Sequence, residues 1–174
     1  RVKGTRLISE AITGAKNGPR TFVCASAIGY YGSRGDETLT EASAPGDDFL
    51  AKVCQEWEEA CQPARDAGVR VVNTRIGVIL STKGGALKKM LTPFKLGLGG
   101  KVGDGQQYMS WVALDDVVGA IQFALATQQA SGPMNLVAPR AVTNAEFTKT
   151  LGRVVSRPTV FPMPAFAARL AFGE

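Results

Sequence analysis

Histidine is absent from this chain of 174 residues. Its absence removes serine–histidine–aspartate and cysteine–histidine catalysis, together with every metal site that uses imidazole ligands. The three cysteines, Cys24, Cys54 and Cys61, have no metal-binding spacing. Cys54 and Cys61 fall on one expected helix about 10.5 Å apart, too far for a disulfide, whose Cα atoms lie within about 7 Å. We therefore expect no metal and three buried free thiols, typical of a reducing compartment such as the cytoplasm.

Long apolar runs are also missing, since no stretch approaches the roughly 18 residues of a membrane helix. No signal peptide is recognisable, because Arg1 begins inside an expected helix. The net charge of +5 comes from 20 basic and 15 acidic residues that are mixed along the chain. We therefore expect neither a membrane nor a nucleic acid as partner.

The segment 83–101 carries a local excess of positive charge, which has two interpretations. It is either a solvated helix face with a basic loop or a rim that attracts phosphate. Its residues are Lys83, Lys88, Lys89, Lys95 and Lys101.

The spacing of apolar residues predicts helices that alternate with strands. Helices are expected at 1–16, 47–67, 86–95, 114–127 and 143–155, and strands at 21–25, 69–74, 108–112 and 134–137. The segment 26–46 is expected to be a loop, and Asp47 or Asp48 caps the helix after it. The C-terminal part of the sequence contains three prolines, Pro158, Pro162 and Pro164. The alternation is typical of α/β proteins with a mostly parallel sheet.

The chain does not open as a dinucleotide-binding fold does. Such folds begin with a strand, a glycine-rich turn and a helix, which hold the pyrophosphate. Here a helix comes first. The similar spacing of Gly100, Gly103 and Gly105 follows no clear strand and precedes no helix. We interpret these glycines as part of a loop.

Five segments carry a resemblance to a known family. In chain order they are CASAIGYYG, GDDFLAKVCQEWE, TRIGVIL, GDGQQYMSWVALDDVVGAI and NLVAPRAVTNAEF. Together they resemble the NAD(P)-dependent epimerase/dehydratase branch of the short-chain dehydrogenase/reductase superfamily, and within it the atypical "epimerase family" proteins. The resemblance implies a middle-to-late portion of a longer protein, with the glycine-rich turn upstream of Arg1 and the family's end beyond Glu174.

The fold expected from this resemblance is α/β: a doubly wound, Rossmann-like parallel sheet that lacks its first βα units. A small C-terminal substrate-binding region completes it. We assign residues 1–80 to the cofactor domain and residues 81–174 to the substrate-binding region. Elements of the sheet are expected to return at about residues 106–137.

The resemblance also implies a catalytic set. In the family, a tyrosine exchanges a proton with the substrate while the nicotinamide moves a hydride. A lysine four residues later on the same helix lowers the pKa of that tyrosine and binds the nicotinamide ribose. Lys52 matches that lysine, but Asp48 stands in the tyrosine's place. Ser26 is the implied match for the serine that holds the substrate oxygen. The family places that serine four residues before its Tyr–Gly pair, whereas Ser26 lies four residues before Tyr30 and five before Tyr31. Tyr30 or Tyr31 either supplies the missing phenol or packs as an aromatic.

Cofactor and substrate contacts follow from the same resemblance. The cofactor expected is NADP, with NAD as the alternative, and the implied contacts are Ala25, Lys52, Arg75, Ile76, Gly77 and Val78. Met109 and Trp111 are the implied substrate contacts, although a tryptophan at such a position is more often a core aromatic than a substrate contact. Nucleotide-sugar enzymes of the family carry an arginine before the aromatic–valine pair, where this chain has Met109 and Ser110. That difference argues against a nucleotide sugar.

Three functions are consistent with these residues. The first is an NAD(P)-dependent oxidoreductase or epimerase-like enzyme acting on a small carbonyl or sugar-like substrate. The second is a catalytically degenerate NADP(H)-binding regulatory or interaction protein, favoured by the missing tyrosine and arginine. The third is a fragment without activity of its own. Relatives pair through two helices, so the resemblance implies a homodimer through helices 1–16 and 47–67.

Overall fold

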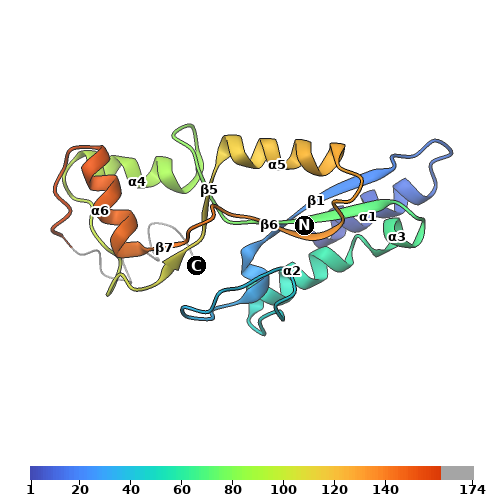
Figure 1. Ribbon diagram of the computed structural model, residues 1–174, viewed down its shortest axis with the longest axis horizontal. Coiled ribbons are helices and arrows are strands. Elements are labelled where there is room, and N and C mark those ends of the chain that lie inside the picture. Colours follow the sequence, from blue (N-terminus) through green and yellow to red (C-terminus); the bar gives the residue numbers. More distant parts are fainter. Residues whose placement is uncertain (162–174) are drawn as a thin grey trace. The chain divides into compact units, whose positions relative to one another are not determined.

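The computed structural model of this chain describes residues 1–161, in which helices and strands alternate (Figure 1). The chain forms two compact units. Unit 1 comprises Arg1–Gly77 and Asp115–Leu136, and unit 2 comprises Val78–Leu114 and the chain from Val137 onward. Pro162 and Pro164 lie outside the described residues, and the expected division at residue 80 stays a prediction. Within residues 1–161, no helix has the length and apolar character needed to cross a bilayer.

Unit 1 is built on a parallel sheet of three strands in the order β1-β2-β6. These strands are β1 (Thr21–Ala27), β2 (Arg70–Ile76) and β6 (Gly132–Leu136). The middle strand is buried, as expected for a parallel strand that is covered on both faces. In the register of the sheet, Ser26 lies beside Arg75, and Arg75 lies beside Asn135. The carboxyl ends of all three strands therefore bring polar residues together.

Helices lie on both faces of this sheet (Figure 1). One face carries α1 (Val2–Thr13), α2 (Phe49–Glu59) and α3 (Gln62–Asp66), and the other carries α5 (Leu114–Ala126). Between the sheet and the three helices lies an apolar core, which contains Cys24, Cys61, Ala64 and Val71. All three cysteines are free and buried, as expected.

The single helix expected at 47–67 is wrong in one respect, because the chain breaks it into α2 and α3. Its start is confirmed: Asp48 caps α2 by accepting a hydrogen bond from the Ala51 N–H at 2.8 Å. The break follows from Pro63, which stands in the first turn of α3 and has no N–H to continue the ladder of α2.

The loop expected at 26–46 starts later than predicted. Strand β1 continues through Ser26 to Ala27, and a 3-10 turn, η1 (Ile28–Tyr31), follows it. The base of the remaining loop is closed by a backbone approach of Gly46 to Gly32. A Cβ on Gly46 would lie 2.8 Å from the Gly32 Cα and 2.8 Å from the Tyr31 carbonyl oxygen, so this approach requires glycine.

Up to residue 161, unit 2 holds two small sheets and two helices. Strand β3 (Val78–Leu80) pairs in parallel with β5 (Trp111–Ala113), and β4 (Tyr108–Met109) pairs antiparallel with β7 (Val142–Thr143). The helices are α4 (Gly85–Lys95) and α6 (Asn144–Val154), the second closed by a capping box of Thr143 and Glu146. The glycines at 100–105 lie in a loop, as expected.

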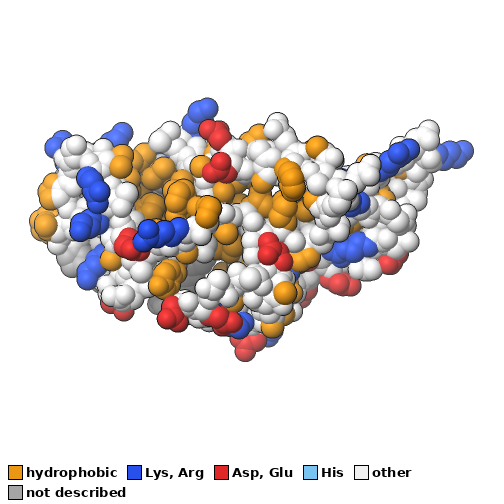
Figure 2. All heavy atoms as spheres, in the orientation of Figure 1, with side chains coloured by type: hydrophobic (Ala, Val, Ile, Leu, Met, Phe, Trp, Pro, Cys, Tyr) orange, Lys and Arg blue, Asp and Glu red, His pale blue; other side chains and the backbone are white. Residues whose placement is uncertain are grey.

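The lysine-rich segment of unit 2 is exposed at each of its five lysines. Figure 2 shows Lys and Arg side chains over the part of the chain that holds α4 and α6. Within the described residues of this unit, the acidic residues are Asp104 and Glu146. The exposure agrees with a solvated helix face, and the phosphate-attracting rim stays a prediction.

Candidate active site

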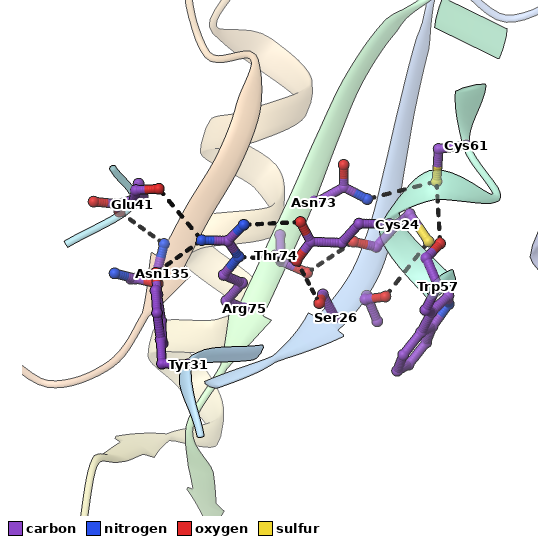
Figure 3. A network of polar contacts seen from close by, with 12 residues as sticks. Cys24, Ser26, Tyr31, Glu41, Trp57, Cys61, Asn73, Thr74, Arg75 and Asn135 are labelled. Atoms are coloured by element: carbon purple, nitrogen blue, oxygen red, sulfur yellow. Dashed lines mark hydrogen bonds and ion pairs between the residues drawn. The ribbon is translucent and has the colours of Figure 1, made fainter. Parts of the chain in front are cut away.

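A buried ion pair joins α2 to the ends of β1 and β2 (Figure 3). Glu58 of α2 accepts hydrogen bonds from Arg75 Nε and Nη2, both at 2.9 Å. It also accepts a hydrogen bond from Ser26 Oγ at 2.7 Å. The Arg75 side chain is only 3% exposed and that of Glu58 13%. The bidentate geometry and the burial make this the strongest charged contact that unit 1 shows.

The other side of the Arg75 guanidinium faces two tyrosines. Its Nη1 donates to the Tyr31 hydroxyl at 3.0 Å and to the Glu41 carbonyl at 3.3 Å. The guanidinium carbon stands 3.4 Å from the centre of the Tyr30 ring. Burial disfavours the charged form, but the hydrogen bonds to Glu58 and Tyr31 outweigh it and raise the pKa of Arg75 above its ordinary value. Arg75 is therefore a permanent cation that orders both tyrosines.

Tyr31 connects this cluster to β6 and to the loop after η1. Its hydroxyl donates to Asn135 Oδ1 at 2.7 Å, and the Asn135 N–H donates to Glu41 Oε1 at 2.8 Å. Tyr31 is 3% exposed. The loop is thus fastened to the strand ends through Glu41, and the Tyr31 hydroxyl is engaged both as donor and as acceptor.

Tyr30 differs from its neighbour in the state of its hydroxyl group. The two rings meet edge to face, with centroids 5.4 Å apart. Tyr30 is only half-buried, and none of the described residues forms a hydrogen bond with its hydroxyl. Of the two tyrosines, Tyr30 is the one whose hydroxyl proton no described residue accepts.

The comparisons with known proteins identify the family. The profile of the NAD dependent epimerase/dehydratase family matches residues 1–137. The chain belongs to this family. Epimerase family protein Mb2239 of Mycobacterium bovis is 48% identical over 174 residues, which is 100% of this chain and 57% of that protein. The Bacillus subtilis epimerase family protein YfhF is 40% identical over 100% of this chain and 57% of its own length. The chain thus spans a little over half of these relatives.

A solved structure agrees over almost the whole chain. The crystal structure of the human epimerase family protein SDR39U1 (isoform 2) with NADPH is 36% identical and superimposes with a TM-score of 0.93. The match covers 99% of this chain and 59% of the human one. The resemblance drawn from the sequence and the Rossmann-like α/β class are both confirmed.

The structure brings together four of the residues expected at a family active site. Ser26, Tyr30, Tyr31 and Arg75 meet in one cluster. The Arg75 side chain points inward, however. Its N–H groups donate hydrogen bonds to other residues of the chain, namely Glu58, Tyr31 and Glu41, rather than facing a ligand. The chemical roles of Ser26, Tyr30, Tyr31 and Arg75 stay predictions.

Lys52 lies apart from that cluster. It is exposed, as are Glu56 and Glu59 on the same side of α2, whereas Ala51 and Cys54 are buried. Lys52 stands two positions from Cys54, or about 200° around the helix. No described residue forms an ion pair with its ammonium group. The role of Lys52 at the cofactor stays a prediction, and the geometry gives it no part in the cluster.

The remaining expected contacts fall at the strand ends or in unit 2. Ala25 is exposed within β1, Ile76 ends β2, and the Gly77 N–H donates to the Leu136 carbonyl at 3.0 Å. Val78 begins β3 of unit 2. The two expected substrate contacts, Met109 and Trp111, also belong to unit 2. There, Asn144 Nδ2 donates to Met109 Sδ at 3.6 Å, and Trp111 is half-buried in β5.

Sequence reasoning missed Glu58, Glu41 and Asn135. The sequence did contain a signal for Glu58. This residue lies four positions after Cys54 and three before Cys61, and such spacing places it on the same buried side of the expected helix as the two cysteines. A glutamate within such a stripe requires a cationic partner. Glu41 sits in an irregular loop and carries no comparable periodicity.

Proposed function

We propose that this chain is part of an NADP(H)-dependent oxidoreductase or epimerase-like enzyme that acts on a small carbonyl or sugar-like substrate. The observation that carries the proposal is the cluster of Ser26, Tyr30 and Arg75 at the carboxyl ends of parallel strands. That edge is where open α/β sheets bind ligands. The human relative solved with NADPH supports the choice of NADP, and NAD is the alternative.

The strand ends fit the nicotinamide end of such a cofactor. Ala25 is exposed although it stands between the buried Cys24 and Ser26, so a small side chain leaves the strand surface open. Ile76 ends the neighbouring strand and Gly77 follows it, and neither residue adds a charge. We propose that these three residues hold the nicotinamide, which when bound supplies or accepts a hydride. The turn that binds the pyrophosphate has no counterpart in this sequence.

The residues of the chain itself would bind the substrate and move a proton. Tyr30 keeps an unshared hydroxyl proton and is the proposed acid and base at the substrate oxygen. A general acid or base in that role typically raises the reaction rate by roughly 10²–10⁴-fold. Arg75 fixes the Tyr30 ring by stacking against its face, and Glu58 fixes Arg75. Trp111 and Met109 stay proposed substrate contacts.

A bulky side chain at Ala25 tests the cofactor site. In the full-length protein, Ala25→Leu is expected to weaken NADPH binding at least 10-fold, because the added atoms would occupy the proposed nicotinamide position. The measurement is a titration of NADPH fluorescence. Ala42→Leu, on an exposed loop residue, is the matched control and should leave the affinity unchanged. If Ala25→Leu binds NADPH as tightly as Ala42→Leu, the proposed nicotinamide site at the end of β1 is wrong.

The same titration decides the role of Lys52. If Lys52 contacts the cofactor ribose, Lys52→Ala weakens NADPH binding without changing the free energy of unfolding, since the side chain is exposed. An unchanged affinity would assign Lys52 to the solvated side of α2.

The alternative function is a catalytically degenerate NADP(H)-binding regulatory or interaction protein. Two observations favour it: Asp48 caps α2 in the place of the family tyrosine, and the Tyr31 hydroxyl is fully engaged within the chain. Saturable NADPH binding without turnover of any sugar, aldehyde or ketone in a panel would support this alternative over the enzyme.

Association with a second copy is proposed through α1 and α2, within the expected ranges 1–16 and 47–67. Leu7 and Ile8 of α1 and Phe49 and Leu50 of α2 are each more than half exposed, which leaves apolar surface for a partner helix. Sedimentation equilibrium of the full-length protein should then give twice the chain mass. A cytoplasmic location is also proposed, and the three free thiols support it.

A further inference from the structure

The two units of this chain differ in charge, a difference that the net charge of the whole chain conceals. Within the described residues, unit 1 holds ten basic and twelve acidic residues, whereas unit 2 holds nine basic and two acidic ones. Both carboxyl groups of unit 2 are engaged within the chain. Asp104 accepts a hydrogen bond from the Gln106 N–H at 3.0 Å, and Glu146 accepts one from the Thr143 N–H at 2.9 Å. The surface of unit 2 is therefore strongly positive.

Helix α4 gathers three of these positive charges on one side. Lys88, Lys89 and Lys95 are exposed, and they fall within an arc of about 120° around the helix. The opposite side packs inward through Phe94, which is buried. None of the described residues forms an ion pair with these lysines, and the sequence from 82 to 102 contains no acidic residue. Such a face suits a partner that carries several negative charges.

Two exposed leucines lie at the end of this charged face. Leu96 is 69% exposed and Leu98 is 60% exposed. Gly97 stands between them with a φ of +74°, and its N–H donates to the Phe94 carbonyl at 3.0 Å. The Leu98 N–H donates to the Pro93 carbonyl at 2.9 Å. These two hydrogen bonds form a Schellman helix end, which fixes the backbone.

Two further contacts hold this turn in place. Gly99 lies directly on the Phe94 ring, where a Cβ would collide with the ring atoms. Arg157 Nε donates to the Lys95 carbonyl at 2.9 Å. The leucines are therefore presented to solvent by a backbone that is fixed on both sides of them.

We propose that α4 and the turn 96–98 form a docking face for an anionic membrane surface. The lysines contact the anionic groups of the lipid heads, and the two leucines insert into the apolar layer beneath them. A nucleic acid would match the lysines but offers no apolar layer for protruding leucines. The expectation of no membrane partner rested on the charge of the whole chain, which averages the two units. This inference goes beyond the proposed function and does not depend on it.

Sedimentation of the full-length protein with lipid vesicles tests the proposal. The vesicles contain either phosphatidylcholine alone or phosphatidylcholine with about one third of phosphatidylserine. Binding to the anionic vesicles is expected to be about 10-fold or more tighter than to the neutral ones. It should weaken steeply as the salt concentration is raised from about 0.1 M to about 1 M. Equal binding to both kinds of vesicle, or binding to neither, would overturn the proposal.

A pair of charge variants locates the docking face. Lys88→Glu with Lys95→Glu is expected to weaken binding to the anionic vesicles about 10-fold or more. Lys16→Glu with Arg20→Glu makes the same change in net charge on exposed residues of unit 1 and should stay within about 2-fold of the unmodified protein. Equal losses in the two variants would mean that net charge alone drives the binding, and would overturn the assignment to α4.

A leucine variant separates a membrane from an acidic protein as the partner. Leu96→Ser with Leu98→Ser keeps the charge and is expected to weaken vesicle binding about 5-fold or more, because apolar area no longer inserts. Binding to poly-glutamate, a soluble polyanion, and the free energy of unfolding should both stay unchanged, since the leucines are exposed. Vesicle binding that survives in this variant, or a lowered stability, would overturn the proposal. Tighter binding of the unmodified protein to poly-glutamate than to anionic vesicles would also overturn it, in favour of an acidic protein.

Discussion

Glu58→Gln is expected to destabilise the protein by about 3–5 kcal/mol, the cost of removing one partner of a buried ion pair. The neutral amide keeps the size of the side chain but leaves the buried Arg75 cation without its counter-ion. It also places an N–H₂ group against a guanidinium N–H, since both oxygens of Glu58 accept hydrogen bonds from Arg75. Urea unfolding of the full-length protein measures the loss.

The same helix supplies the controls for this prediction. Glu56→Gln and Glu59→Gln make the same chemical change on the exposed side of α2, and each should stay within about 0.5 kcal/mol of the unmodified protein. In a double-mutant cycle, Arg75→Met should be far less costly in the Glu58→Leu background than alone. A loss for Glu58→Gln no larger than that of its two neighbours would mean that the ion pair does not hold the strand ends.

Tyr30→Phe is expected to lower turnover by roughly 10²–10⁴, because it removes the proposed proton donor. Its free energy of unfolding should hardly change, since no described residue bonds to the hydroxyl that is lost. Tyr31→Phe should do the reverse. It leaves Arg75 Nη1 and Asn135 Oδ1 without the Tyr31 oxygen and proton, at a cost of about 1–3 kcal/mol in stability.

The two tyrosine variants are therefore each other's control. Initial rates of NADPH oxidation and urea unfolding are measured for both. Turnover that survives in Tyr30→Phe would rule out Tyr30 as the acid. Turnover lost in Tyr31→Phe at unchanged stability would assign that role to Tyr31.

Apolar periodicity predicted most elements of the fold. Helices α1 and α5 and strands β1, β2 and β6 follow from spacing alone, because burial imposes that spacing on the sequence. The two- and three-residue strands of unit 2, β3 and β7, are too short to produce a recognisable alternation. Pro63 was a visible signal for the break between α2 and α3, although the apolar stripe continues across it.

The site was harder to predict than the fold. The family resemblance indicated Lys52, but the direction of a helical side chain depends on which face packs against the sheet. Here Ala51 and Cys54 take that face and leave Lys52 exposed. The contact between Glu58 and Arg75 spans 17 positions, and that between Tyr31 and Asn135 spans 104. Local patterns hold no information about pairs so far apart, whereas the strand ends that carry Ser26 and Arg75 were recognisable.

The most direct test of the proposed oxidoreductase uses NADPH in which both hydrogens at C4 of the nicotinamide ring are replaced by deuterium, so that either face can deliver the label. The full-length protein is incubated with this cofactor and a panel of sugars, aldehydes and ketones, and the products are analysed by mass spectrometry and ²H NMR. The account predicts deuterium on the former carbonyl carbon, with transfer lost in Tyr30→Phe. Bound NADPH that transfers no deuterium to any carbonyl compound in the panel would contradict it.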